Sequence, residues 1–209
     1  MRITKFGHSC LLVEDGAGRL LLDPGAYSAG FEELTGLTAV LITHQHPDHV
    51  DLDKLPAVLE RNPEAVLHSD EGTAAQLADR GLPVRPVHAG DMLDVGTRVR
   101  VVGRDHAVIH PDVPVVPNTG YLVAERFFHP GDSLTVPDAE VELLGVPTAA
   151  PWLKAAEAVD YLRAVRPRVA MPIHDAVLRM PEMVYGLFRR LKPEATELRV
   201  IDGGEPADF

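Results

Sequence analysis

The sequence predicts an α/β protein in which strands and helices alternate after a strand-rich start. Short apolar runs separated by turn residues open the chain, and they predict three strands, at Arg2–Phe6, Cys10–Val13 and Arg19–Leu22. Further along, strand-sized apolar runs alternate with segments of helical periodicity. This pattern favours either two sheets or one large mixed sheet, with helices on the outer faces.

The remaining elements follow from the spacing of apolar residues along the chain. Helices are predicted around Leu52–Leu59, from a cap at Ser69 or Asp70 to about Gly81, at Lys154–Val165 and at Met183–Leu191. Strands are predicted at Ala39–Ile42, Ala65–His68, Val84–Val87, Arg98–Val102, Tyr121–Ala124, Arg126–His129, Val141–Val146, Arg168–Ile173 and Leu198–Ile201. No linker or low-complexity tract interrupts them, so we expect a single domain spanning residues 1–209.

Composition narrows the classes of function. The net charge is −11 and no basic run is present, which argues against a protein that grips nucleic acid. Cys10 is the only cysteine, so any metal site must be built from His, Asp and Glu. No segment approaches the ~20 apolar residues of a membrane span, and the N-terminus lacks the apolar stretch of a signal peptide. We therefore expect a cytoplasmic protein acting on small molecules without membrane insertion, and leave its oligomeric state open.

Four apolar strands each end in an ionisable residue. They lead into Asp23, into His44, into His129 with Asp132 close behind, and into His174. In α/β sheets, side chains at the carboxyl ends of separate strands converge on rigid supports. The sequence therefore predicts that His and Asp gather at one edge of the sheet.

The densest group is the run His44-Gln45-His46-Pro47-Asp48-His49, directly after a buried strand. Two histidines at i and i+2 in an extended backbone point the same way, so both imidazoles can close on one ion. Asp48 and His49, beyond the Pro47 bend, can face a second position. Imidazole and carboxylate suit zinc, and also iron or manganese.

This run matches the His-x-His-x-Asp-His signature without substitution, and the chain resembles the metallo-β-lactamase superfamily over nearly its whole length. The resemblance implies an αββα sandwich of two mixed β-sheets with two metal ions at one edge. The first ion would take His44, His46 and a third histidine, placed at His106 with His110 as its competitor. Asp132 would bridge both ions. The ligands of the second ion would be Asp48, His49, Asp132 and His174.

Two further segments are similar to a narrower branch of that superfamily. Gly7-His8-Ser9-Cys10 and Leu20-Leu21-Leu22-Asp23-Pro24-Gly25 look like the opening of the branch that contains L-ascorbate 6-phosphate lactonase and N-acyl-phosphatidylethanolamine phospholipase D. The resemblance implies that His8 and Asp23 lie beneath the metals and hydrogen-bond to ligand imidazoles or to substrate. His129 is expected to support the ligands or to be structural.

The resemblance implies a hydrolase in which two divalent ions, zinc or else manganese or iron, share Asp132 and a hydroxide nucleophile. Asp48 would orient the water or accept its proton. We expect a small-molecule ester, lactone, amide or phosphodiester as substrate. The proline-rich segment Pro111–Asn118 is either one wall of a substrate pocket, with Tyr121 and Trp152 nearby, or a plain connection.

Three other functions compete with this interpretation. A nuclease of the same fold and a non-enzymatic metal sensor are both compatible with the motifs. A redox role of the flavodiiron type is disfavoured, because those proteins replace the second histidine of the signature with Glu, whereas His46 is present here.

Overall fold

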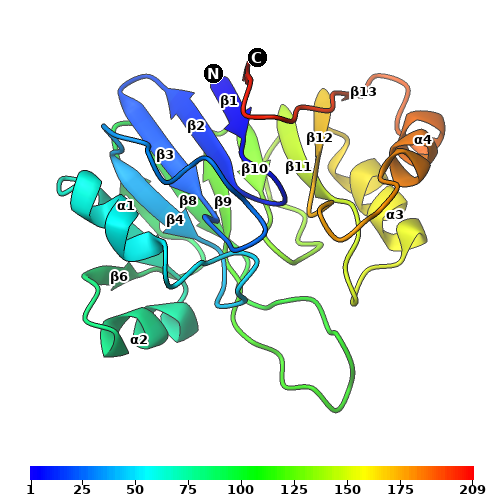
Figure 1. Cartoon of the computed structure of the whole chain (residues 1–209). Helices are drawn as coiled ribbons and strands as arrows, with labels where there is room; N and C mark the ends of the chain where they lie inside the picture. The colour runs from blue at the N-terminus through cyan, green and yellow to red at the C-terminus, as the bar shows by residue number, and fades with distance from the viewer.

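The computed structural model describes residues 1–209, which form two seven-stranded sheets packed face to face (Figure 1). The first sheet has the order β14 (Pro206–Asp208), β1 (Arg2–Lys5), β2 (Leu11–Asp15), β3 (Gly18–Leu22), β4 (Ala39–Ile42), β5 (Val66–Ser69) and β6 (Val84–Pro86). The second sheet has the order β13 (Glu197–Leu198), β12 (Val169–Ile173), β11 (Leu143–Pro147), β10 (Phe127–His129), β9 (Gly120–Val123), β8 (Arg98–Val102) and β7 (Met92–Asp94).

Both sheets are mixed. In the first, the pairs from β14 to β3 are antiparallel and those from β3 to β6 are parallel. In the second, β7 to β10 pair antiparallel and β10 to β13 parallel. The expectation of two mixed sheets is confirmed, and the alternative of one large sheet is wrong.

The core follows from the alternation of side chains along each strand. Leu20 and Leu22 of β3 face the space between the sheets, where they join Leu41 and Tyr121, whereas Leu21 faces outward. A period of two sends successive side chains to opposite faces, so a strand of continuous apolar residues must be covered on both sides. The uninterrupted Leu-Leu-Leu run is therefore the mark of an inner strand.

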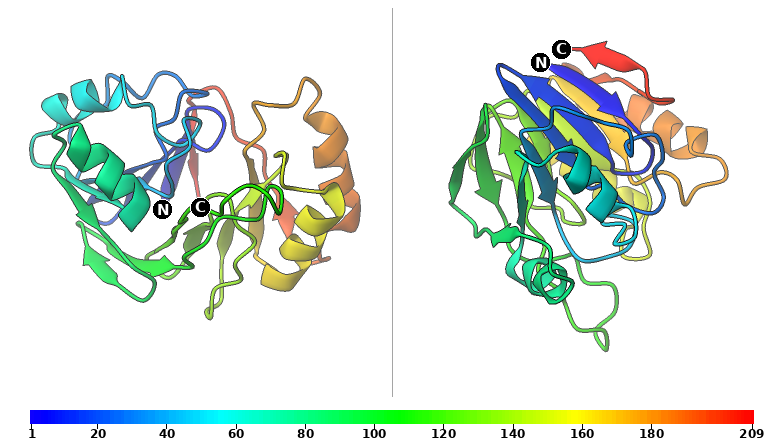
Figure 2. Two further views of the ribbon diagram at one scale, coloured as in Figure 1. Left: turned by 90° about the horizontal axis from the view of Figure 1, so that it is seen from below. Right: turned by 60° about the vertical axis from the view of Figure 1, so that its left-hand side comes forward.

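Helices supply the outer covers. The helices α1 (Leu55–Arg61) and α2 (Glu71–Asp79) pack on the first sheet, and α3 (Ala155–Val165) and α4 (Glu182–Leu191) on the second. Seen from below, the two pairs lie on opposite sides of the molecule (Figure 2). This arrangement is the αββα sandwich that the resemblance implied. None of these helices combines the length and apolarity needed to cross a membrane.

The element boundaries differ from the prediction mainly at the sheet edges. The strands β7 and β14 were not predicted, because both are three-residue edge strands with exposed ends and no apolar alternation. The predicted strand Leu198–Ile201 is wrong beyond Leu198, since only Glu197–Leu198 pairs with β12. Leu52 precedes the first helix, which begins at Leu55 with Pro56 in its first turn.

Removing the cap of α2 tests how far local signals stabilise this fold. The Asp70 carboxylate accepts hydrogen bonds from the backbone N–H groups of Gly72 at 2.8 Å and Thr73 at 3.0 Å. We expect Asp70→Ala to lower the free energy of unfolding by about 1–2 kcal/mol in urea titrations, because the first turn loses its acceptor. Asp53→Ala, which removes a 98% exposed carboxylate, is the control. Equal stability of the two variants would contradict the prediction.

Candidate metal centre

The candidate ligands lie on four loops that leave the same edge of the sandwich. These loops follow β4, β8, β10 and β12, and they carry His44 to His49, His106, Asp132 and His174 respectively. Their nitrogen and oxygen atoms form two compact groups, within each of which all candidate ligand atoms lie within 4.8 Å of one another. One group is His44, His46, His106 and Asp132, and the other is His8, Asp48, His49 and His174.

Asp132 lies between the two groups. Its Oδ2 is 3.3 Å from Nε2 of His106 in the first group. Its Oδ1 is 3.1 Å from Nε2 of His49 and 3.2 Å from Nε2 of His174 in the second. The two oxygens of one carboxylate therefore face different groups, which is the arrangement that a ligand shared by two ions requires.

The far nitrogens of His49, His106 and His174 are already engaged, and this fixes the tautomer of these three rings. The Nδ1–H of His49 donates to Asp23 Oδ2 at 2.7 Å. The corresponding donors of His106 and His174 bond the carbonyl oxygens of Ala107 at 2.5 Å and Ala149 at 2.6 Å. In the neutral ring the proton is then on Nδ1, so each Nε2 presents a lone pair to the centre.

The atoms that face the centre lack hydrogen-bond partners. Nε2 of His49, His106 and His174 and Oδ1 of Asp132 are buried without one. Buried polar atoms are nearly always satisfied, so four such atoms converging on two points indicate missing ligands rather than poor packing. Imidazole nitrogens and a carboxylate are the donors that zinc, manganese or iron accept, so the residues fit two divalent ions.

His8 supports the centre and does not ligate a metal, as its tautomer indicates. Its Nδ1 accepts the backbone N–H of Ala176 at 3.3 Å, so the ring proton is on Nε2 and donates to Asp48 Oδ2 at 3.2 Å. A nitrogen that carries a proton cannot ligate a metal. The structure thus places His8 behind Asp48, where it bonds a carboxylate and not a ligand imidazole.

Asp23 and Gly25 fix the position of the loop after β4. Asp23 is fully buried and accepts the Thr43 N–H at 2.7 Å and hydroxyl at 2.8 Å, in addition to His49. A Cβ on Gly25 would lie 1.8 Å from the carbonyl oxygen of Asp48, so only glycine allows this close approach. The Asp-Pro-Gly segment therefore sets where both Asp48 and His49 lie.

His129 supports the loop that carries Asp132. Its Nε2–H donates to the Ser9 carbonyl at 2.9 Å, while its Nδ1 accepts the Gly131 N–H at 3.1 Å. Asn118 adds a second restraint, because its side chain accepts the Asp132 N–H at 2.9 Å and donates to the Pro130 carbonyl at 2.9 Å. His129 is thus a structural residue one step removed from the ligands.

Three residues of the site have left-handed backbone conformations, although none is glycine. The φ angles are 46° at His8, 46° at Asp23 and 57° at His174. Such conformations cost of order 1–3 kcal/mol each and persist only where surrounding contacts enforce them. At His174 the backbone N–H bonds the His8 carbonyl at 3.1 Å, which joins two of these strained positions directly.

A buried ion pair holds the segment just after His174. The Lys5 side chain is 2% exposed, and its ammonium contacts the Asp175 carboxylate. The ammonium also donates to the Pro172 carbonyl at 3.1 Å. The Tyr185 hydroxyl donates to the same Asp175 oxygen at 2.5 Å. Residues on both sides of His174 are therefore tied to β1 and α4, which holds its strained backbone in place.

The structure places His106 and His110, the two candidates for the third ligand, differently, and it also locates the expected pocket neighbours. His106 joins the first group, whereas the side chain of His110 is 62% exposed and its ring accepts the Asp112 N–H. Tyr121 as a neighbour of a substrate pocket is wrong, because it is fully buried between the sheets and donates to the Ile42 carbonyl. Its strand position, paired with Val101, gives the physical reason.

Trp152 is the residue that sequence reasoning placed only loosely. Its indole Nε1–H donates to Asp132 Oδ2 at 2.8 Å, and its ring meets the edge of the His106 ring at 5.9 Å between centroids. The contact joins residues 20 positions apart with no motif between them, so no local signal could have revealed it. Because it is the only tryptophan, it is a natural optical reporter of the centre.

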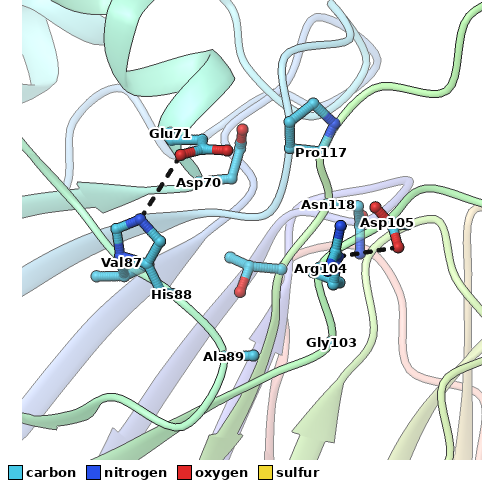
Figure 3. Close-up of a pocket in the computed structure, with 11 residues that line it drawn as sticks. Asp70, Glu71, Val87, His88, Ala89, Gly103, Arg104, Asp105, Pro117 and Asn118 are labelled. Carbon is cyan, nitrogen blue, oxygen red and sulfur yellow. Dashed lines mark ion pairs between the residues drawn. The ribbon is translucent and has the colours of Figure 1, made fainter.

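The proline-rich segment belongs to a loop that projects from the lower edge of the sandwich (Figure 1). The base of this loop is closed by backbone hydrogen bonds from His106 to Val116 and from Asn118 to Arg104, each 3.0 Å long. Beside the base lies a cavity of about 390 Å³ whose lining residues are mostly polar or charged (Figure 3). Asn118 lines this cavity while it holds the Asp132 loop, so the cavity adjoins the first group.

The histidines of the two groups differ in the direction in which their pKa values are shifted. Burial lowers the pKa of His44 and His46, and the neighbouring imidazoles act in the same direction, so both rings are neutral. Burial would also lower the pKa of His174, but contacts with Asp132 and Asp48 raise it to about 9. The pKa of His49 is raised as well, against the effect of burial, by Asp132 and Asp23.

Proton release tests this difference. At pH 7.5 the metal-free His174 is protonated because its pKa is about 9, so an ion entering the second group must displace a proton. We expect at least one proton to be released with the second equivalent of zinc and much less with the first. Calorimetry in buffers of different ionisation enthalpy measures both. The release should vanish well above pH 9, and its absence at pH 7.5 would contradict the assignment.

The buried ion pair gives a second test. Lys5→Met leaves the Asp175 carboxylate buried with only the Tyr185 hydroxyl, and we expect about 3–5 kcal/mol lower stability. The strained His174 then loses one of its restraints, so affinity for the second equivalent of metal should fall at least tenfold. Urea titrations and chelator competition measure the two effects. Arg2→Met, which breaks the exposed Arg2–Asp208 pair on the same strand, should change neither.

Comparison with known proteins agrees with this geometry. Residues 2–174 match the model of the beta-lactamase superfamily domain. Protein Rv0786c of Mycobacterium tuberculosis is 56% identical over 85% of each chain. A UPF0173 metal-dependent hydrolase of Methylobacterium nodulans is 29% identical over 93% of this chain and 89% of its own. Igni18, a metallo hydrolase from Ignicoccus hospitalis, superimposes with a TM-score of 0.77 at 19% identity, covering 100% of this chain and 98% of its own. The chain therefore belongs to the metallo-β-lactamase superfamily.

Proposed function

We propose that this protein is a metal-dependent hydrolase that holds two divalent ions, zinc in the first instance, and cleaves a small-molecule ester, lactone, amide or phosphodiester. The observation that carries the proposal is the convergence of four buried, unpartnered ligand atoms on two points that share Asp132. The names of the Methylobacterium and Ignicoccus proteins, a metal-dependent hydrolase and a metallo hydrolase, support the same class of reaction.

The first group would hold one ion through His44, His46 and His106, and the second group would hold the other through Asp48, His49 and His174, with Asp132 shared. Bound divalent ions supply a Lewis acid for the attacked oxygen and lower the pKa of water toward neutrality. Manganese or iron would satisfy the same donors.

Asp48 is the residue that we assign to proton transfer. Its side chain is 20% exposed, whereas Asp132 is 4% exposed, so Asp48 is the carboxylate of the site that substrate and water can reach. Burial would raise the pKa of Asp48, but hydrogen bonds with His174 and His8 hold it well below its usual range. It is therefore ionised at neutral pH and able to orient a water. Accepting the proton would require that the hydrogen bond from His174 is lost first, because that loss raises the pKa of Asp48.

The supporting residues keep this carboxylate aimed. The His8 Nε2–H donates to Asp48 Oδ2, and the backbone N–H of Ala176 fixes the His8 ring from behind. Trp152 similarly donates to Asp132 and restrains its Oδ2. Holding both carboxylates before substrate arrives lowers the reorganisation that the reaction needs.

The acidic charge favours a small molecule over a nucleic acid. A net charge of −11 and the lack of a basic run disfavour binding to a phosphate backbone. Binding to RNA that weakens steeply with salt would argue for a nuclease instead.

Metal analysis and a substrate panel test the proposal. We expect about two equivalents of metal per chain, and turnover of at least one member of an ester, lactone, amide and phosphodiester panel. Asp48→Ala should lower kcat at least hundredfold, because it removes the proton acceptor and one ligand. Asp112→Ala, which removes a 91% exposed carboxylate of the projecting loop, is the control. Full activity of metal-free protein, or equal turnover by Asp48→Ala, would refute the proposal.

A further inference from the structure

Most of the exposed large apolar residues lie on segments that follow the candidate site residues in the chain. Of the eleven large apolar residues that are exposed, only Met92 and Val200 lie elsewhere. The other nine lie on segments that follow Asp23, His106, Asp132 and His174, and they are Tyr27, Val108, Ile109, Val113, Val115, Val136, Val177, Met180 and Met183. Single exposed apolar residues are ordinary, but their concentration on one region marks a binding surface.

Three of these side chains are tied directly to the site. The Tyr27 ring meets the edge of the His8 ring at 5.3 Å between centroids. Val108 follows Ala107, whose N–H donates to the Asp132 carbonyl at 2.8 Å. Val177 follows Ala176, whose N–H donates to Nδ1 of His8. We call Tyr27, Val108 and Val177 the apolar rim.

The rim residues come from three separate loops, which bring apolar surface to the centre from different parts of the chain. The exposed fractions are 56% for Tyr27, 58% for Val108 and 48% for Val177. In the view from below, the loop that contains Val108 runs across the lower edge between the two halves of the molecule (Figure 2). Each rim residue is thus exposed and lies beside a group that contacts the centre.

We propose that the substrate carries an unbranched apolar chain next to its reacting group, and that the apolar rim binds this chain. The inference rests on the proposed function, since the metal centre would hold the polar reacting group. Removing a methylene of the substrate and the rim from water together is favourable, and the gain grows with each methylene that the rim covers. The rim would thus select substrates by the length of the apolar chain, and the metal centre would select them by the reacting group.

A series of n-alkyl hydroxamic acids from two to eight carbons tests the inference without needing the natural substrate. Hydroxamates chelate zinc through their oxygens, so the head group stays constant while the chain grows. Binding to the zinc-loaded protein is measured by calorimetry and by the fluorescence of Trp152, which donates to Asp132. We expect the Kd to fall about two- to fourfold for each added methylene until the rim is covered.

Substitutions of the rim provide the decisive comparison. In the triple variant Tyr27→Ser, Val108→Ser and Val177→Ser, octanohydroxamate should lose at least tenfold in affinity while acetohydroxamate changes less than twofold. The double variant Met92→Ser and Val200→Ser is the matched control, because it removes exposed apolar side chains away from the centre. It should bind the whole series as the unmodified protein does. If the triple variant fails to fold, Val108→Ser alone should retain the effect on octanohydroxamate in smaller size.

The remaining outcomes overturn the inference in distinguishable ways. If the Kd of the unmodified protein does not change with chain length, the rim does not bind the apolar chain. The same conclusion follows if the triple variant shows the same dependence of Kd on chain length as the unmodified protein. The unmodified protein could instead form a dimer that the triple substitution disrupts, with a Kd that does not depend on chain length. That result would assign the surface to a second copy of the chain. Failure of the protein to bind zinc, or failure of zinc-loaded protein to bind even acetohydroxamate, would refute the proposed function and the inference with it.

Discussion

The carboxylate of Asp132 is the constraint on which the rest of the site depends. It is 3% exposed, and a buried charge is tolerated only when it is paired and hydrogen-bonded. The protein surrounds it with the imidazoles of His49, His106 and His174, and adds the indole N–H of Trp152. Each of these partners lies on a different strand or loop. The two sheets must therefore come together in one register for the charge to be compensated, which links the fold to the centre.

The strain around this carboxylate has the same origin. To bring His8, Asp23 and His174 to the centre, the chain must turn sharply at the end of a strand or in a short connection, and each turn uses a left-handed residue. Glycine would adopt these conformations freely, but it could not supply the side chain that the site needs. The hydrogen bond from His174 N–H to the His8 carbonyl and the Lys5–Asp175 pair supply the stabilisation that offsets the strain.

Much of this could be predicted from the sequence because its signals are local. The run from His44 to His49 is contained within six residues, and the apolar period along each strand reports which faces are covered. The ends of β4, β10 and β12 carry ionisable residues that the fold brings together, as the positions of the apolar strands in the sequence predicted. The short edge strands gave no such periodicity and were missed.

What could not be predicted depends on pairs that are distant in the sequence. The Trp152–Asp132 contact and the Lys5–Asp175 pair span 20 and 170 positions, and neither belongs to a motif. The choice of His106 over His110 also needed the fold, because both follow the same strand and only the backbone pairing of His106 with Val116 turns one ring inward. Composition and spacing carry no information about such pairings.

The sharing of Asp132 couples the two halves of the centre. In the metal-free protein its negative charge raises the pKa of His49 and His174, whereas burial lowers the pKa of His44 and His46. A cation in the first group would partly neutralise the Asp132 carboxylate. The carboxylate would then stabilise the protonated forms of His49 and His174 less. The pKa values of His49 and His174 would then fall, and their nitrogens would become available as ligands. One buried carboxylate thus provides a physical reason for the first group to be loaded before the second.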